Sequence, residues 1–498
     1  MTAFAKDGRQ YVVTVYMSPD TDMPYWQCKC SSFELTENGP KVVADNVQIS
    51  FNQGGMRNCN RPAIANDGKN VVWTYGSDYM DPNTTYIYAG VLDAQCGKVI
   101  PEMQISTTNN NDNGGTSMVF NGTVDGVSRF VATSFENGNG GIAWAYGLSL
   151  SYDEETGDPL LKRNFEKKAY TGTNIARQKV APIDNDRTLY CGPDGNQRPP
   201  ERGVVCVVLD KTGNVIPGSR TTIAKTDKTQ DIYYNQPNIA VLDYNRFAIQ
   251  VLRSNGEGRK DNGKGSNNAE LYIYEVSEDS QLILKSQLTN IETTFQTHSS
   301  ICSGQYGAPG TSGQHATSIA MIAAPPTGVG QGMMQMLSWS PETDFMIDSR
   351  DEWIISEYAD SGHQSNMYGA NPNNQGRDFM NCIGNVPNPG YGVEGGFMPT
   401  VKTLFVAPMS GKKPDQAKNA QFLSFIPGAS DAPLTTPADG PSDGGDPSGD
   451  GPDILAPDAL TEQAGACSVA SPGPSSNNDW AALGLLALGM FISRRRNT

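Results

Sequence analysis

The chain has 498 residues, of which 37% are hydrophobic and 18% are charged, and its formal net charge is −16. This composition is too polar for a protein that crosses a membrane many times, and the negative charge disfavours nucleic acid as a partner because phosphates repel it. The 53 glycines and 32 prolines indicate many turns. Short β-rich runs are common and long helical periodicities are scarce, so the sequence predicts an all-β fold.

A turn motif recurs along the first half of the chain. Each copy places an Asp, usually beside Gly or Asn, between two apolar runs, and these residues are Asp7, Asp67, Asp125, Asp184 and Asp243. Neighbouring copies lie 58 to 60 residues apart. Since Asp, Asn and Gly tolerate the positive φ of tight hairpins, we expect turn-forming rather than catalytic roles for these residues.

Four β-rich runs fit into each repeat of about 59 residues, which is typical of a propeller blade. A sixth unit fits 318–322 with 333–339, and a seventh fits 397–401, 403–407 and 421–426, after Gly- and Asn-rich insertions at 254–268, 303–314 and 362–396. The sequence therefore predicts a β-propeller of about seven four-stranded blades over residues 1–428. Six or eight blades, or a pair of β-sandwich domains, are the alternatives.

The first unit begins almost at its turn, with a leading strand cut to Thr2–Phe4. The first residues, Met1–Asp7, also lack the basic region and apolar stretch of a signal peptide. We therefore expect a truncated first blade and a chain that starts at an internal position of a longer protein.

The chain has nine cysteines, and none of them forms a CxxC pair. Only three histidines, His298, His315 and His363, could complete a zinc site. We therefore expect no zinc, no other metal and no cofactor. Cys467 belongs to the C-terminal tail described below. The other eight cysteines allow up to four disulfides, with free buried thiols as the alternative. We predict a local bridge between Cys191 and Cys206, which fall on successive strands of one unit.

The other cysteines are constrained less by their spacing. Cys28 and Cys30 share one strand and should have different partners, for which Cys59 and Cys96 are candidates. We expect Cys302 and Cys382 in inserted loops.

The composition changes after residue 428. Residues 429–466 are rich in Asp, Pro, Gly and Ser and nearly devoid of aromatic residues. Such a segment cannot bury enough apolar surface to offset the entropy of ordering it, so we predict a disordered acidic linker. Weak calcium binding by its Asp residues is the alternative.

The tail at 467–498 combines Cys467, an apolar run from Trp480 to Ile492, and the terminal cluster Arg494, Arg495 and Arg496. Thirteen helical residues span roughly 20 Å, less than the ~30 Å hydrocarbon core. The pattern predicts a short helix over 480–493 that enters a membrane transiently with its arginines on the cytoplasmic side. A docked amphipathic helix is the alternative.

These three features resemble the tripartite C-terminal sorting signal of myxobacterial surface proteins, the MYXO-CTERM type. The resemblance covers about 35 residues and lacks the second Cys that is frequent near the first. It implies export, processing near Cys467 by cell-envelope sorting machinery, and delivery to the cell surface or outer membrane.

None of the common catalytic motifs that we sought is present: neither a GxSxG elbow, HExxH, a Walker loop, nor a GxGxxG on a βαβ unit. We therefore predict a binding module for glycan or protein ligands rather than an enzyme, with Trp339, Trp353, Tyr368 and Tyr391 as candidate stacking residues. A sialidase-like or other glycan-active hydrolase is the main alternative, which requires a carboxylate pair or a Tyr–Glu pair with an Arg cluster. A purely structural coat protein is the third hypothesis.

Overall fold

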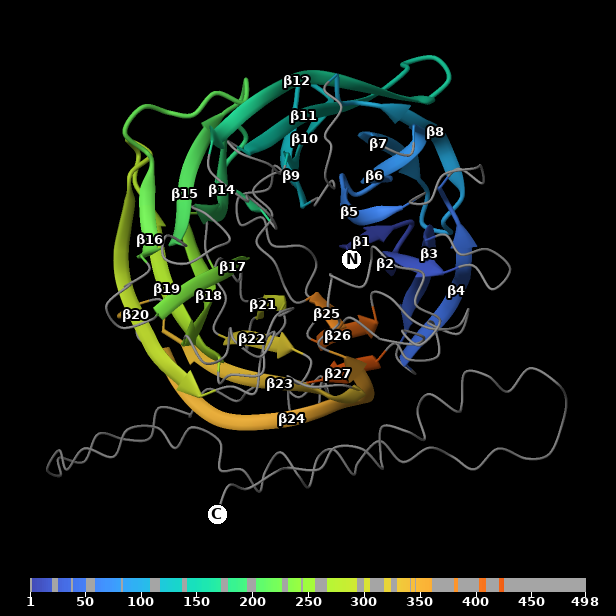
Figure 1. The fold of residues 1–498 in the computed structure, drawn as a ribbon. Helices are drawn as coiled ribbons and strands as arrows, with labels where there is room; N and C mark the ends of the chain where they lie inside the picture. Colours follow the sequence, from blue (N-terminus) through green and yellow to red (C-terminus); the bar gives the residue numbers. More distant parts are fainter. Residues whose placement is uncertain are drawn as a thin grey trace, which may run out of the picture.

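A computed structural model describes twenty segments of the chain: 2–19, 26–36, 39–50, 59–81, 84–107, 117–136, 141–171, 178–194, 203–225, 232–242, 245–255, 267–292, 300–304, 318–323, 329–340, 342–344, 346–360, 380–383, 403–408 and 421–424. Regular structure in these segments consists of β-strands (Figure 1). The strands form seven antiparallel sheets, each built from strands consecutive in the sequence.

The first three sheets contain β1 (Thr2–Lys6), β2 (Arg9–Pro19), β3 (Trp26–Thr36) and β4 (Gly39–Gln48); β5 (Asn60–Asn66), β6 (Val71–Asp81), β7 (Thr84–Leu92) and β8 (Lys98–Gln104); and β9 (Met118–Val124), β10 (Val127–Glu136), β11 (Ile142–Tyr152) and β12 (Pro159–Thr171). The fourth and fifth contain β13 (Lys179–Pro182), β14 (Arg187–Asp194), β15 (Gly203–Asp210) and β16 (Thr221–Lys225); and β17 (Ile232–Val241), β18 (Arg246–Asn255), β19 (Asn267–Val276) and β20 (Leu282–Glu292). The last two contain β21 (Ser300–Gly304), β22 (Ser318–Ala323), β23 (Val329–Trp339) and β24 (Met346–Asp360); and β25 (Met380–Ile383), β26 (Thr403–Pro408) and β27 (Gln421–Ser424).

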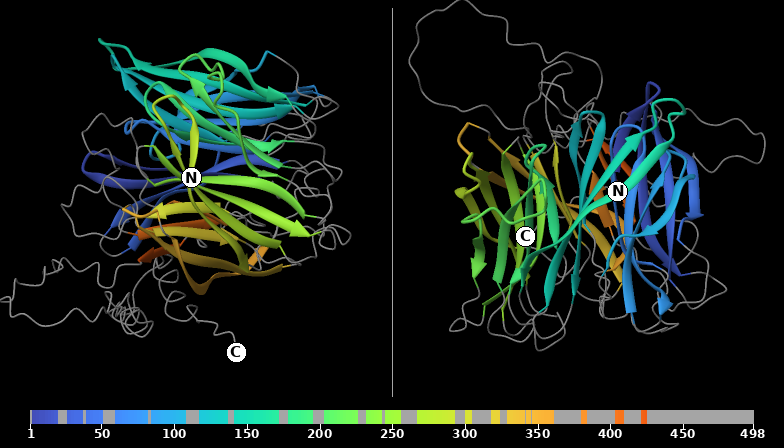
Figure 2. Two further views of the ribbon diagram at one scale, coloured as in Figure 1. Left: turned by 90° about the vertical axis from the view of Figure 1, so that its left-hand side faces the viewer. Right: turned by 90° about the horizontal axis from the view of Figure 1, so that it is seen from above.

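The sheets stand around a central axis with the first strand of each innermost, as Figure 1 shows along the axis and Figure 2 shows from two sides. First strands of successive sheets are neighbours from β1 to β25, and β27 of the seventh sheet meets β4 of the first. The predicted all-β propeller of about seven blades is therefore confirmed. Six sheets have four strands, and the seventh has three within the described residues.

The first sheet has four strands, of which β1 has five residues and pairs with residues 9–13 of the eleven-residue β2. Two expectations about later parts of the ring were wrong. The seventh sheet does not begin at 397–401: β26 pairs with β25, which lies inside the stretch predicted as an insertion. Cys302 and Cys382 accordingly lie on β21 and β25, not in loops.

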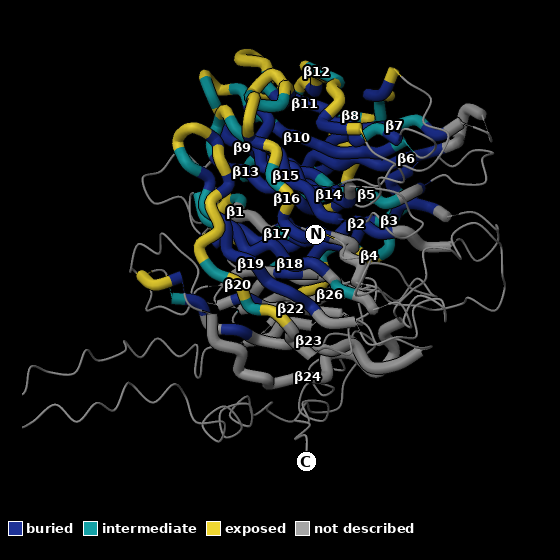
Figure 3. Tube along the Cα trace, turned by 60° about the vertical axis from the view of Figure 1, so that its left-hand side comes forward, coloured by how far each residue is buried: buried dark blue, intermediate teal, exposed yellow. Residues whose placement is uncertain are grey.

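The hydrophobic core lies between neighbouring sheets. Five clusters of buried side chains fill the boundaries from the first sheet to the sixth. A blade is therefore covered on both faces, which explains why inner strands such as β15 are apolar without alternation. Outermost strands such as β12 face solvent on one side and carry exposed residues (Figure 3).

Three disulfides reinforce the described part of the ring. Cys28 and Cys30 of β3 bond to Cys59 and Cys96, so two bridges tie the first sheet to the second. Cys191 on β14 and Cys206 on β15 are joined within the fourth sheet, opposite each other in register.

Antiparallel pairing gives the propeller two distinct faces. In sheets one to five, one face carries the turns between first and second strands and between third and fourth strands; we call it the turn face. The other carries the connections between second and third strands and between successive sheets; we call it the loop face. Most turns are short and described, whereas many connections of the loop face lie outside the described residues.

The turn at Asp125 and Gly126 allows a direct test of why the repeat motif contains glycine. Gly126 has φ 74°, a left-handed conformation that costs L-residues about 1 to 2 kcal/mol. A Cβ there would meet no atom within 4 Å, so the backbone alone sets the penalty. We expect Gly126→Ala to lower the free energy of unfolding by about 1 kcal/mol, measured by urea denaturation, and Gly126→Asn to cost less. Equal stability of Gly126→Ala and the wild type would contradict this reading.

Several predicted features lie outside the described residues. They are the turn residue Asp243, the linker 429–466, and the tail with Cys467, Arg494, Arg495 and Arg496. Among the described residues, no helix is long and apolar enough to cross a membrane.

Candidate functional site

Four of the five repeat Asp residues are described, and all lie on the turn face between the first and second strands of their sheets. Asp7 and Asp125 have positive φ, 52° in both cases. Asp67 accepts the backbone N–H groups of Lys69 and Asn70, each at 2.9 Å. These side chains shape the hairpins that start each blade.

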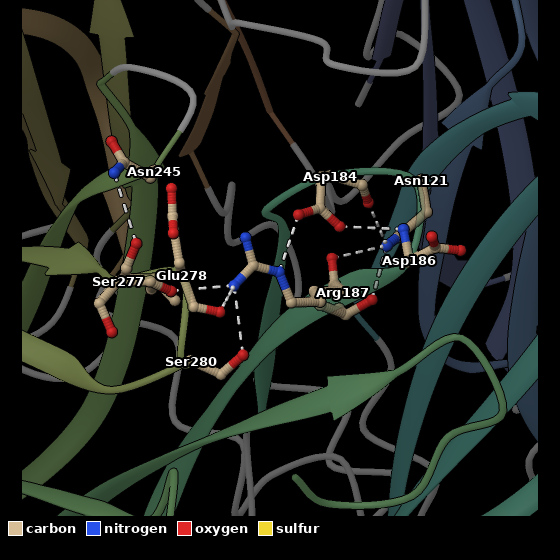
Figure 4. A network of polar contacts seen from close by, with 10 residues as sticks. Asn121, Asp184, Asp186, Arg187, Asn245, Ser277, Glu278 and Ser280 are labelled. Carbon is tan, nitrogen blue, oxygen red and sulfur yellow. Dashed lines mark hydrogen bonds and ion pairs between the residues drawn. The ribbon is translucent and has the colours of Figure 1, made fainter.

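Arg187 on β14 forms the densest polar network on this face (Figure 4). Its Nε donates to Asp184 Oδ2 at 2.8 Å, within its own sheet. One terminal nitrogen reaches the fifth sheet, where it donates to the carbonyls of Ser277 and Glu278 and to the Ser280 hydroxyl at 2.9, 3.1 and 3.2 Å. The guanidinium thus connects two blades.

Side chains on the first or second strands of other sheets also connect neighbouring blades. Asn121 on β9 donates to the carbonyl of Arg187 at 3.1 Å and to the Thr188 hydroxyl. Arg246 on β18 pairs with Asp344 of the sixth sheet at 3.3 Å. Each contact couples one sheet to the next, so we assign the turn face a structural role.

Tyr152 gives this coupling a measurable pH dependence. Its hydroxyl donates to Asp67 Oδ2 at 2.8 Å, between the third sheet and the second. Burial, followed by the nearby Asp67 carboxylate, raises the pKa of Tyr152 well above 10. A raised folded-state pKa contributes stability that is complete below the unfolded value near 10 and is lost as the pH rises toward the folded value.

We therefore expect Tyr152→Phe to destabilise the protein at pH 8, by about 1 kcal/mol for the lost hydrogen bond, and to make the stability less sensitive to pH above 10. Urea unfolding of both proteins at pH 8 and pH 11 measures the effect. If the gap between variant and wild type were unchanged at pH 11, Tyr152 would not be the titrating group.

A second series of Asp residues was missed from the sequence. Asp93, Asp153 and Asp210 begin the turns between third and fourth strands, and each accepts two backbone N–H groups at 2.8 to 3.0 Å. Hydrogen bonds from Thr156 and Glu155 lower the pKa of Asp153. The signal was available, because a Gly follows each Asp three or four residues later at nearly the same repeat spacing.

At the loop face, charged and aromatic groups lie on neighbouring strands of sheets two and three. Glu136 ends β10, and its Oε2 accepts the indole N–H of Trp144 at 3.4 Å. Lys168 Nζ lies 5.7 Å from the Trp144 ring. From the second sheet, Arg61 extends over the ring of Phe135, 5.0 Å from its centroid. We call Arg61, Glu136, Trp144 and Lys168 the loop-face cluster.

The backbone at Arg61 is unusual for an inner strand. Arg61 has φ 48°, and the pairing of β5 with β6 is irregular between Asn60 and Ala63. Such bulges re-aim side chains and are frequent next to functional sites. Here the bulge places the Arg61 guanidinium of the second sheet over the ring of Phe135 in the third sheet. Phe135 directly precedes Glu136.

A different trio has the residue types of a sialidase-like site. Arg253 lies 3.7 Å from Glu270, and the Tyr272 hydroxyl donates to the same carboxylate. However, Glu270 is 3% exposed, and Tyr272 packs into the cluster between sheets four and five. The trio lies on second and third strands and satisfies its own charges, so we assign it a structural role.

The predicted stacking residues receive little support. Trp339 is 3% exposed and belongs to the core between sheets five and six. Trp353 lies on β24, while Tyr368 and Tyr391 are outside the described residues. The described residues also contain no group of three His, Cys, Asp or Glu side chains that could hold a metal ion.

No protein-family model matches the chain, and no curated protein does. Similar solved structures include an α-L-arabinofuranosidase from Fusarium graminearum, with 9% identity over 70% of this chain and 88% of that chain and a TM-score of 0.43. An α-L-arabinanase from Penicillium chrysogenum shows 10% identity over 72% and 91%, with a TM-score of 0.40. A subtype N11 neuraminidase-like protein of A/flat-faced bat/Peru/033/2010 shows 9% identity over 70% and 82%, with a TM-score of 0.36. Similarity this low identifies no functional residue.

Proposed function

We propose that this protein is an exported, surface-displayed β-propeller that recognises a glycan at its loop face. The loop-face cluster supports the proposal, because it brings a carboxylate, an indole and two cations from different strands to one end of the ring. Carboxylates and guanidinium groups bind sugar hydroxyls through charge-assisted hydrogen bonds. On the turn face, the described side chains of Arg187 and Arg246 already pair with Asp184 and Asp344.

Cleavage of a glycan at the same face is the second candidate. Glu136 favours it, since glycoside hydrolysis uses carboxyl groups that flank the scissile bond, and Glu136 supplies one at this face. Hydrolysis by a carboxylate pair requires a second carboxylate, and the loop-face cluster as described contains one. We therefore rank recognition first.

A glycan array beside a glycosidase panel tests the proposal. The panels should include arabinan oligosaccharides and sialylated glycans, since similar solved structures are named for acting on such compounds. We expect binding that falls at least tenfold in Glu136→Gln and in Arg61→Met. Asp186→Asn, an exposed change on the turn face, is the matched control and should bind normally. Equal binding by all four proteins would contradict the assignment, and turnover abolished by Glu136→Gln would establish the hydrolase.

Export is supported by the three disulfides, which persist in oxidising compartments. Surface delivery rests on the proposed roles of Cys467 and the Arg494–Arg496 cluster. We expect removal of residues 467–498 to release the propeller into the medium, and Cys467→Ala to block processing. Unchanged surface labelling of both variants in the native host would exclude the sorting role.

A further inference from the structure

Gln178 carries a buried amide for which the described residues supply no hydrogen-bond partner. It directly precedes β13, the innermost strand of the fourth sheet, and therefore lies at the loop-face end of that strand. The residue is 1% exposed, and within the described part of the chain neither its Oε1 nor its Nε2 has a partner. Burying both polar atoms of an amide without partners is costly, and native proteins rarely do so.

The surroundings of Gln178 explain how the amide is held but not what it binds. Lys179 pairs with Cys191, so Gln178 stands opposite Gly192. A Cβ built on Gly192 would lie 2.0 Å from the Tyr170 hydroxyl and 3.2 Å from Gln178 Cγ, so the position admits only glycine. The Tyr170 hydroxyl itself donates to the carbonyl of Pro193 at 3.3 Å. The aliphatic part of Gln178 is thus packed, while its amide lacks partners.

Gln178 is connected to the loop-face cluster through packed aromatic residues. Tyr170 meets Tyr190 edge to face, with ring centroids 5.9 Å apart. The Tyr190 hydroxyl donates to the carbonyl of Trp144 at 3.1 Å, and Trp144 in turn donates to Glu136. The amide therefore lies one sheet further round the ring than Glu136 and Trp144. Tyr170 and Tyr190 belong to the core between sheets three and four, whereas the Trp144 ring belongs to the core between sheets two and three.

We propose that Gln178 is a specificity-determining residue of the glycan site, and that it binds two adjacent hydroxyl groups of a neutral sugar. A primary amide presents one acceptor and one donor side by side. Vicinal hydroxyls match this pair, because one hydroxyl donates to Oε1 while its neighbour accepts from Nε2. This inference rests on the proposed glycan-binding function and names the chemistry that the site selects.

The test combines stability and binding of Gln178→Leu, which keeps the approximate shape and removes both polar atoms. Without ligand, the melting temperature should rise, because the unpaired amide no longer has to be buried. Affinity for arabinobiose, or for the strongest neutral hit of the array, should fall at least tenfold by titration calorimetry. Gln104→Leu is the matched control: Gln104 donates to the Ser106 carbonyl at 2.7 Å, so this change should lower the melting temperature slightly and leave binding unchanged.

The outcomes separate this inference from the function on which it rests. If the wild type binds neutral glycans and Gln178→Leu binds them equally well, the role of Gln178 is wrong while the function stands. A lower melting temperature with unchanged affinity would indicate that the amide binds a buried water molecule and stabilises the fold. That result would contradict the proposed role in sugar binding. If the wild type binds no glycan at all, the proposed function fails and this inference fails with it.

Discussion

Replacing Cys30 and Cys96 together by alanine should lower the free energy of unfolding by about 4 kcal/mol. The bridge closes a loop of 66 residues, and in the chain-entropy model the stabilisation grows with the logarithm of loop length. It also ties the first sheet to the second, so its loss should loosen that boundary. Urea unfolding of the purified, oxidised proteins measures the difference.

The double replacement of Cys191 and Cys206 is the matched comparison. These residues are separated by 15 positions within one sheet, so the same model gives about 3 kcal/mol. Both pairs are buried, which makes the loss of packed sulfur atoms similar. A larger effect for the short loop than for the long one would contradict the assigned role of the Cys30–Cys96 bridge in holding blades together.

Replacing Arg187 by methionine should destabilise the protein by about 3 kcal/mol. The change removes the donors to the fifth sheet and leaves Asp184 without its ion pair, while the aliphatic part of the side chain is kept. Hydrogen bonds that involve a charged group contribute about 1.5 to 3 kcal/mol each, and their effects in one network do not add fully. Calorimetric and urea unfolding should agree on the size of the loss.

Two further variants define what Arg187 does. Arg187→Lys should recover only part of the stability, since a single ammonium group cannot bond Asp184 and the Ser277 carbonyl in the guanidinium geometry. Lys211→Met removes an exposed cation 3.8 Å from Asp186 and should change stability by less than about 0.5 kcal/mol. Similar losses in Arg187→Met and Lys211→Met would show that general charge, not the blade contact, is responsible.

The fold could be read from the sequence because its determinants are local and repeated. An Asp or Asn beside Gly is sufficient to specify a hairpin, and the runs on both sides are apolar enough to be strands. Cys191 and Cys206 could be proposed as partners for the same reason, since the hairpin between their strands sets the register. The nearly constant spacing then indicated a ring.

The missed features depend on contacts that leave no local pattern. β25 is four residues long and lies in a Gly- and Asn-rich stretch, so neither alternation nor length distinguishes it. Arg187 bonds residues 90 to 93 positions away. Gln178 is notable only once its burial is known, because an isolated glutamine is unremarkable in a sequence. The candidate site therefore emerged from the packing of the sheets.

The most direct test of glycan recognition at the loop face is a crystal structure of the protein soaked with arabinobiose or with the strongest hit of the array. We expect sugar density beside Glu136, with hydroxyl groups within hydrogen-bond distance of Arg61 or Gln178. Sugar density confined to the turn face around Arg187, or an empty loop face at a saturating ligand concentration, would contradict the account.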